Sequence, residues 1–291
     1  MNGGDGRVVL AAFVTSAVLA GGNAVAIRFS NRELDPLWGA TLRFSLAAAL
    51  LVGVMAVLRL AFPRGIAAIG AVLYGSLNIG AAFGLAYYAL VELQAGFGQI
   101  VLALVPLATL VLAVLQRQER LRFAALVGAL LGLAGIFVMS RTSLPDTVPL
   151  VSLFAAVGSA LCFAQAAVVV RRFPRVHPVT MNATGMATGA ALLLVGSALA
   201  GETRQLPRDG ETWAALAYLA VVGSVVVFVL YLFVLERWSA SRTSYQFLLI
   251  PVVTVALSAW LDDEAIGLGL VFGGLLVFAG VYVGVLRPMR E

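Results

Sequence analysis

The sequence predicts an all-α integral membrane protein whose ten transmembrane helices form two inverted five-helix repeats around a central cavity. Composition is the first reason. Of the 291 residues, 62% are hydrophobic and 11% are charged, and the mean hydropathy is +1.01, whereas soluble domains carry about 25% charged residues. Apolar segments long enough to cross a hydrocarbon core of roughly 30 Å recur along the whole chain. The third reason is an internal repeat, because the stretch 83–139 realigns without a gap on 228–284.

Ten apolar segments recur along the whole length of the chain and are expected to be its transmembrane helices. In order they cover about 8–29, 37–60, 67–90, 95–116, 121–140, 148–170, 179–200, 212–235, 241–260 and 266–286. The first segment is too long for a signal peptide and lacks a clear cleavage site, so it counts as a span. The four tryptophans fall at span ends, where indole rings favour the membrane interface; they are Trp38, Trp213, Trp238 and Trp260.

The repeat divides the chain into a first half, 1–143, and a second half, 144–291. A shift of 145 positions places Pro106 on Pro251 and Glu119 on Glu264. The polar joint at 117–122 is basic, and its counterpart at 262–267 is acidic. Because five spans are an odd number, the second half must enter the membrane from the opposite face, as in carriers that open a central site to alternate sides. A duplication retained only for packing is the alternative.

The arginines predict how the chain lies in the membrane. If the spans alternate, thirteen arginines fall on one side and five on the other, and Arg43 lies inside a span. The positive-inside rule makes the richer side cytoplasmic, so both termini are predicted to face the cytoplasm of a bacterial-type inner membrane. The partner of this basic charge is therefore expected to be the lipid bilayer and not a nucleic acid.

Short motifs of the first half match the pattern of a known family, and the repeat carries Pro251, Glu264, Gly273 and Gly280 at the corresponding positions of the second half. The motifs of the first half are Thr41-Leu42-Arg43-Phe44, Tyr88-Ala89-Leu90, Pro106, Glu119 and the run from Gly128 through Leu131 to Gly135. With these motifs the chain resembles the EamA-type family of the drug/metabolite transporter superfamily. The resemblance implies ten helices around a cavity lined mainly by the third, fourth, eighth and ninth spans, with help from the first and sixth. Many members carry a tryptophan where this chain reads Ala20-Gly21-Gly22-Asn23.

The same resemblance implies the export of small metabolites. Length and aromatic content are most similar to the amino acid exporters of the family, including those for aromatic amino acids. Purines, cationic drugs and other small organic solutes are the alternative substrates. Ten spans can enclose a cavity within one chain, so a functional monomer is expected.

Polar side chains deep in the spans are the candidates for substrate binding, because a polar group in lipid is costly unless it is paired or faces a water-filled cavity. In the first span Asn23 shares a helical face with Ser16, and Gln165 takes the corresponding position in the sixth span. Hydrogen bonding between helices is the alternative role for these two amides.

The spans expected to line the cavity supply the other candidates. They are Tyr74 and Asn78 in the third span, Gln99 in the fourth, Tyr231 in the eighth, and Ser244 and Tyr245 at the start of the ninth. Amides both donate and accept hydrogen bonds, and aromatic faces accommodate a planar or bulky apolar group, which favours a zwitterionic or uncharged polar ligand. Gln246 points about 100° away from Tyr245 on a helix and is therefore left out.

Two prolines and one arginine stand out within the spans. Pro106 and Pro251 interrupt the backbone hydrogen bonds of the fourth and ninth spans, so both are predicted to be hinges of alternating access. Arg43 is the only formal charge well inside a span. It could pair with a substrate carboxylate, extend to the headgroups or serve a structural role, and the structural role is favoured.

Several kinds of chemistry find no support in the sequence. One cysteine, Cys162, and one histidine, His177, leave no metal-ligand cluster and no nucleophile paired with a base, so no enzyme, metal or cofactor is expected. No carboxylate lies in the middle of a span, where a proton-driven antiporter usually needs one. The sequence therefore predicts movement of the substrate down its gradient. A channel is the alternative to a carrier, although no charged ring is evident.

Overall fold

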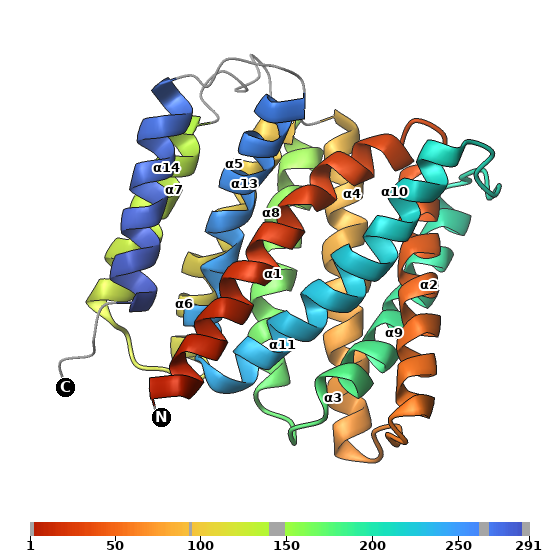
Figure 1. The fold of residues 1–291 in the computed structure, drawn as a ribbon, viewed down its shortest axis with the longest axis horizontal. Helices are drawn as coiled ribbons and strands as arrows, with labels where there is room; N and C mark the ends of the chain where they lie inside the picture. The colour runs from red at the N-terminus through yellow and green to blue at the C-terminus, as the bar shows by residue number, and fades with distance from the viewer. Residues whose placement is uncertain (1–2, 93–94, 140–148, 262–267, 287–291) are drawn as a thin grey trace.

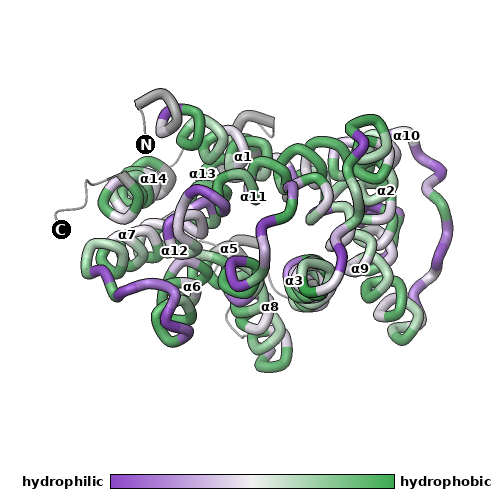
Figure 2. Tube along the Cα trace, turned by 90° about the horizontal axis from the view of Figure 1, so that it is seen from below, coloured by the Kyte–Doolittle hydropathy of each residue, from purple (hydrophilic) through white to green (hydrophobic). Residues whose placement is uncertain are grey.

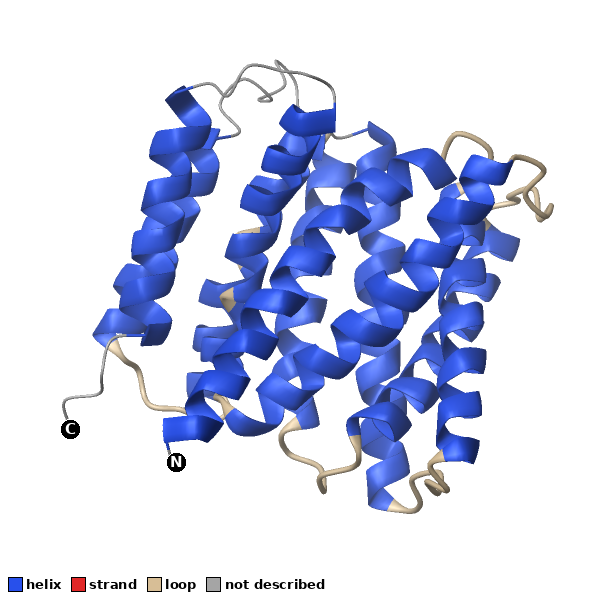
Figure 3. Cartoon of the chain, in the orientation of Figure 1, coloured by secondary structure: helices blue, strands red, loops and turns tan. Residues whose placement is uncertain are grey.

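In the computed structural model, residues 3–92, 95–139, 149–261 and 268–286 are described, and all regular secondary structure within them is helical (Figure 3). The predicted all-α class is confirmed. The helices are α1 (Gly3–Ser30), α2 (Pro36–Val57), α3 (Ile66–Gly75), η1 (Ser76–Ala81), α4 (Ala82–Glu92), α5 (Ala95–Leu102), α6 (Val105–Leu115), α7 (Phe123–Met139), α8 (Leu150–Val170), α9 (Pro178–Leu199), α10 (Gly210–Ala220), η3 (Val221–Val226), α11 (Val227–Arg237), α12 (Ala240–Ser244), α13 (Gln246–Leu261), α14 (Leu268–Val281) and η4 (Tyr282–Leu286).

Six helical segments are long and apolar enough to cross a membrane. They are Gly6–Ile27, Pro36–Val57, Ile66–Ala89, Leu150–Val170, Pro178–Leu199 and Gly210–Arg237. Shorter apolar helices cover Ile100–Leu115, Phe123–Val138 and Val271–Val285. Each predicted span corresponds to one helix or to consecutive helical pieces. The number of ten crossings and the inverted arrangement of the halves stay predictions.

Two of the predicted spans change helical type in the middle. The π-helical segment η1 joins α3 to α4, and the π-helical segment η3 joins α10 to α11. A π-helix bonds residue i to residue i+5, and such turns within α-helices frequently occur at functional sites. The two segments begin and end 145 positions apart, which is the shift of the sequence repeat. The duplication therefore extends to local backbone geometry.

Helices α7 and α14 pack side by side and run antiparallel at one edge of the bundle (Figure 1). Glycines permit this approach, because a Cβ on Gly128 would lie 2.6 Å from the carbonyl oxygen of Gly280, and one on Gly135 would lie 2.6 Å from that of Gly273. In the sequence repeat Gly128 corresponds to Gly273 and Gly135 to Gly280. Each helix thus contacts the other through a pair of glycines at equivalent positions of the repeat, as a two-fold relation requires.

Helices α2 and α9 form a second antiparallel pair at the opposite edge (Figure 1). The carboxylate of Glu202, which follows α9, accepts hydrogen bonds from the backbone N–H groups of Leu37 at 3.0 Å and Trp38 at 2.8 Å. An acidic group stabilises the positive end of a helix dipole. This contact ties the first turn of α2 to the connection 200–209.

The arginine-rich connections gather at one end of the bundle, where α1 begins and η4 ends (Figure 1). Figure 2 views this end and shows hydrophilic residues along the connections, with hydrophobic residues over much of the helical bundle. The arginines of the connections 58–65, 116–122 and 171–177 are Arg59, Arg64, Arg117, Arg120, Arg122, Arg171, Arg172 and Arg175. The structure therefore brings together the charges that the sequence assigns to the cytoplasmic side.

Candidate functional site

A small cavity lies between helices of the two halves. Its lining comes from α1, η1, α4, α8, α11 and α13, with the side chains of Ala20, Asn23, Asn78, Phe83, Phe163, Val227, Phe228, Tyr231, Gln246, Phe247 and Ile250. The cavity holds about 80 Å³, less than the roughly 300–1,000 Å³ usual for small-molecule sites. A ligand the size of an amino acid therefore requires the cavity to widen.

Aromatic rings form a large part of the cavity wall, where five of the eleven lining residues are phenylalanine or tyrosine. The ring centroid of Phe83 lies 5.4 Å from Phe163 with the rings nearly perpendicular, and 6.3 Å from Phe228. Phe163 continues the wall to Phe247 at 5.3 Å. These spacings are those of stabilising aromatic pairs. Because the four phenylalanines come from four different helices, the wall exists only after the halves have packed together.

Polar side chains interrupt this wall at a few points. The Asn78 amide donates to the Tyr74 hydroxyl at 3.3 Å. The Asn23 amide donates to the Gly223 carbonyl at 3.4 Å, and its own oxygen, Oδ1, is buried without a partner. Gln246 accepts a hydrogen bond of 2.9 Å from Ser16. A polar atom that is buried and unpartnered is costly, so a bound donor would stabilise the free oxygen of Asn23, which lies against Gly223 of η3.

Arg43 lies directly behind the cavity wall and is completely buried. Its Nε donates to the Ser224 hydroxyl at 2.8 Å, and its Nη2 donates to the Gly223 carbonyl at 3.0 Å. Its guanidinium carbon lies 4.8 Å from the ring centroid of Phe44 and 5.3 Å from that of Phe83. The zero exposure excludes the alternative in which Arg43 extends to the headgroups.

Three of the predicted site residues line the cavity, namely Asn23, Asn78 and Tyr231. Tyr74 does not line the cavity, but its hydroxyl accepts from Asn78 and its ring belongs to the same buried cluster as Tyr231. Gln99 lies in α5, but its side chain is outside the described residues. Sequence reasoning had no signal for the phenylalanines of the wall, because phenylalanines are also common on the outer, lipid-facing surface of this chain.

The structure does not bring the other three predicted residues to the cavity. Gln165 accepts a hydrogen bond of 2.8 Å from Gln116 near the arginine-rich end. The Ser244 hydroxyl donates to the Ser241 carbonyl at 2.7 Å. The Tyr245 hydroxyl donates to the Ala125 carbonyl, so this ring packs against α7. The angular separation of Tyr245 from Gln246 holds, but Gln246 faces the cavity and Tyr245 faces the packing interface.

The two predicted hinges occupy different surroundings. Pro106 follows the break between α5 and α6, at the start of α6. Pro251 lies inside the uninterrupted helix α13, and the break in the ninth predicted span is at Tyr245 instead. A proline at the first turn of a helix removes no internal hydrogen bond, whereas one inside a helix does. The hinge role stays a prediction for both residues.

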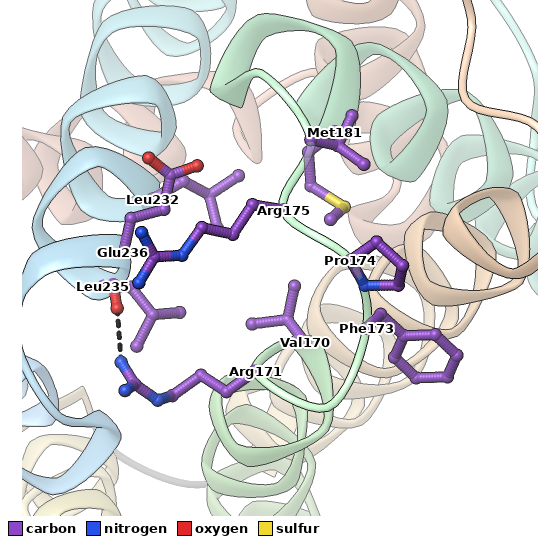
Figure 4. A pocket seen from close by; sticks show the side chains of 10 residues that line it. Val170, Arg171, Phe173, Pro174, Arg175, Met181, Leu232, Leu235 and Glu236 are labelled. Atoms are coloured by element: carbon purple, nitrogen blue, oxygen red, sulfur yellow. Dashed lines mark hydrogen bonds between the residues drawn. The ribbon is translucent and has the colours of Figure 1, made fainter.

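A second cavity of about 100 Å³ lies at the arginine-rich end, around the connection 171–177 (Figure 4). Arg171 donates to the Leu235 carbonyl at 2.7 Å, and the side chains of Arg175 and Glu236 extend toward each other across the opening (Figure 4). Both arginines are exposed, so this crevice belongs to the solvated end of the bundle. The cavity between the halves is therefore the better candidate site.

Comparison with known proteins identifies the family and supports the fold. The sequence pattern of the EamA-like transporter family matches residues 7–141 and, a second time, residues 150–286. An uncharacterized transporter of Archaeoglobus fulgidus is 26% identical over 284 residues, which cover 95% of this chain and 97% of that protein. A second transporter so named from the same organism is 26% identical over 104 residues, which cover 36% of each chain. A solved crystal structure superposes with a TM-score of 0.81 over 98% of this chain and 99% of its own, at 22% identity, which supports the fold.

Proposed function

This chain belongs to the EamA-like transporter family and is a membrane transporter, and on that premise we propose that it exports amino acids with apolar or aromatic side chains by alternating access. Ten spans in two inverted halves, embedded in the inner membrane with both termini in the cytoplasm, would enclose the transport pathway within one monomer. Purines and cationic drugs are the alternative substrates.

The observation that carries the choice of substrate is the cavity between the halves. Its phenylalanine wall suits an apolar or planar side chain. Asn23, Asn78 and Gln246 place amide groups beside that wall, where they can hold the polar end of the same molecule. A sugar or another strongly hydrated solute would leave this aromatic surface without a matching partner.

Alternating access is supported by the size of the cavity and by the helices around it. The cavity is too small for the proposed substrate, so the helices that line it must separate on at least one side during transport. The π-helical segments η1 and η3 and the break before Pro106 interrupt regular α-helical hydrogen bonding next to the cavity lining. Hinges are expected at such interruptions.

The coupling mechanism follows from the charges in the spans. No aspartate or glutamate is among the residues that line the cavity in the described part of the chain. A proton relay in the membrane usually needs such a group. We therefore infer gradient-driven exchange of the substrate, and proton flux strictly tied to substrate flux in proteoliposomes would contradict this.

The test is counterflow of labelled phenylalanine and leucine in proteoliposomes, with two variants of the same helix. Phe163→Ala removes a ring from the cavity wall, whereas Phe154→Ala removes a ring that is 71% exposed on the surface of α8. We expect Phe163→Ala to weaken exchange about 10-fold or more and Phe154→Ala to leave it near the wild-type level. Equal exchange by both variants would refute the assignment of the cavity. Absence of saturable counterflow would refute carrier function.

A further inference from the structure

The strongest unexplained feature of the cavity region is the charge of Arg43. Its side chain has no exposed surface and its Nη1 makes no hydrogen bond of good geometry, while the Tyr87 hydroxyl lies close enough to the guanidinium to interact with it. The ion pairs in the described part of the chain are Arg32 with Glu211 and Arg237 with Glu236, so Arg43 has no carboxylate partner there. A buried charge is costly unless it is paired, and in a membrane protein such a residue usually marks a pathway or a binding site.

We propose that Arg43 is the anion-binding group of the transport cavity and takes the carboxylate of the substrate at its free Nη1. This inference rests on the proposed function, because it names the part of the substrate that selects the site. The ligand class is a small carboxylate with an apolar side chain, and the α-amino acids belong to it.

Contacts between Arg43 and the cavity lining support this assignment. The carbonyl oxygen of Gly223 accepts from Arg43 at 3.0 Å and from the cavity residue Asn23 at 3.4 Å. The ring of Phe83, which lines the cavity, also lies beneath the guanidinium. Arg43 and the cavity thus share two neighbours, the Gly223 carbonyl and the Phe83 ring. When the cavity widens, a carboxylate can reach the guanidinium without crossing another layer of the bundle.

The free groups also match the two ends of an amino acid. Nη1 of Arg43 is a charged donor without an acceptor, and Oδ1 of Asn23 is an acceptor without a donor. A carboxylate satisfies the first and an ammonium group satisfies the second. A cationic ligand without a carboxylate would instead meet an uncompensated positive charge, so the structure disfavours cationic drugs.

A purely structural role is the alternative reading of Arg43. Two of its nitrogens hold Gly223 and Ser224 in η3, and that alone could stabilise the π-helical segment. The two readings differ in what they predict for different ligands. A structural arginine would affect every ligand equally, whereas an anion-binding arginine affects only ligands with a carboxylate.

The experiment measures counterflow by the reconstituted wild-type protein with two amino acids, and compares each acid with its carboxamide and with the amine of the same side chain. The probes are phenylalanine and leucine, their carboxamides, and the amines that lack the carboxyl group altogether. We expect both acids to exchange, and the amides and amines to compete about 10- to 100-fold more weakly, as expected for loss of a hydrogen bond to a charged group. This comparison needs no variant, so it holds even if substitutions at Arg43 prevent folding.

Variants then test whether Arg43 causes the preference for acids over amides and amines. Arg43→Gln should remove the advantage of the acids over the amides, and Arg43→Lys should keep part of it. Arg32→Gln makes the same charge change at an exposed surface position and should leave the preference intact. A uniform loss across acids, amides and amines in Arg43→Gln, or an unchanged preference, would overturn the proposal.

The outcomes separate this inference from the proposed function. If amides or amines exchange as well as the acids in the wild-type protein, the carrier function stands and the anion site at Arg43 is refuted. If none of the six probes exchanges although the protein is folded, the assignment of amino acids fails and the anion site fails with it.

Discussion

Substitution of Gly128 by alanine tests the contact on which the antiparallel α7–α14 pair depends. An added Cβ would lie 2.6 Å from the Gly280 carbonyl oxygen, 2.8 Å from the Gly284 nitrogen and 2.9 Å from the Gly284 Cα. All three are backbone atoms, so no side-chain rotation can relieve the overlap. An ordinary contact begins at 3.4 Å, and the two helices must therefore separate locally by roughly 0.8 Å.

The cost of this separation can be worked from general magnitudes. A gap of about 0.5–1 Å forfeits a quarter to a half of the dispersion attraction between facing atoms, and helices in a membrane depend on that attraction for association. Overpacking of this kind costs about 1–3 kcal/mol. Replacing glycine by alanine within a helix also stabilises the helix by up to about 1 kcal/mol. A glycine-to-alanine substitution at an uncrowded helical position is therefore needed to cancel this gain.

Gly53 supplies that reference, because it lies within α2 and a Cβ there would meet nothing within 4 Å. Since the gain in helix propensity is common to both substitutions, Gly128→Ala should be less stable than Gly53→Ala by about 1–3 kcal/mol. The assay is reversible unfolding in mixed detergent micelles, followed by circular dichroism. Equal stability of the two variants would refute the close approach of α7 and α14.

Two further predictions concern the outer connection and the broken helix. Backbone hydrogen bonds, of which the one from Arg208 has the largest effect, hold the pKa of the exposed Glu33 carboxyl below its usual 4.5. Because the pKa in the folded state is lower than in the unfolded state, the stabilisation from this contact is complete above about pH 4.5 and is lost as the pH falls through the folded-state pKa. After correction for the intrinsic pH dependence of amide exchange, the protection of the Arg208 and Asp209 backbone N–H groups should therefore fall at acidic pH in the wild-type protein and stay independent of pH in Glu33→Gln. An identical pH response of these two amides in both proteins would contradict the contact. Pro106→Ala should slow counterflow several-fold more than Pro251→Ala, because Pro106 lies at a real helix break; equal or unaltered rates would count against a hinge there.

The amino-acid sequence alone determined the helical membrane class, the positions of the apolar segments and the duplication. Each of these depends on a sum over about 20 neighbouring residues or on a comparison of long stretches, so errors at single residues cancel. Asn23, Asn78 and Tyr231, the predicted binding residues that line the cavity, were singled out because a polar group deep in an apolar segment is rare. Their role in binding stays a prediction. The π-helical segments were not predicted, since each lies inside an apolar segment that the sequence presents as one continuous span.

Only the tertiary structure decided which face of each helix looks inward. A helix that is hydrophobic all round has no polar side to mark its outer surface, so its rotation cannot be inferred from periodicity. Tyr245 and Gln246 are adjacent in the chain, yet packing directs the first to α7 and the second to the cavity. Gln165 lies deep in its span by sequence but finds Gln116 as its partner. The aromatic wall and the neighbours of Arg43 likewise come from distant segments, because contacts between halves are fixed by packing and not by spacing along the chain.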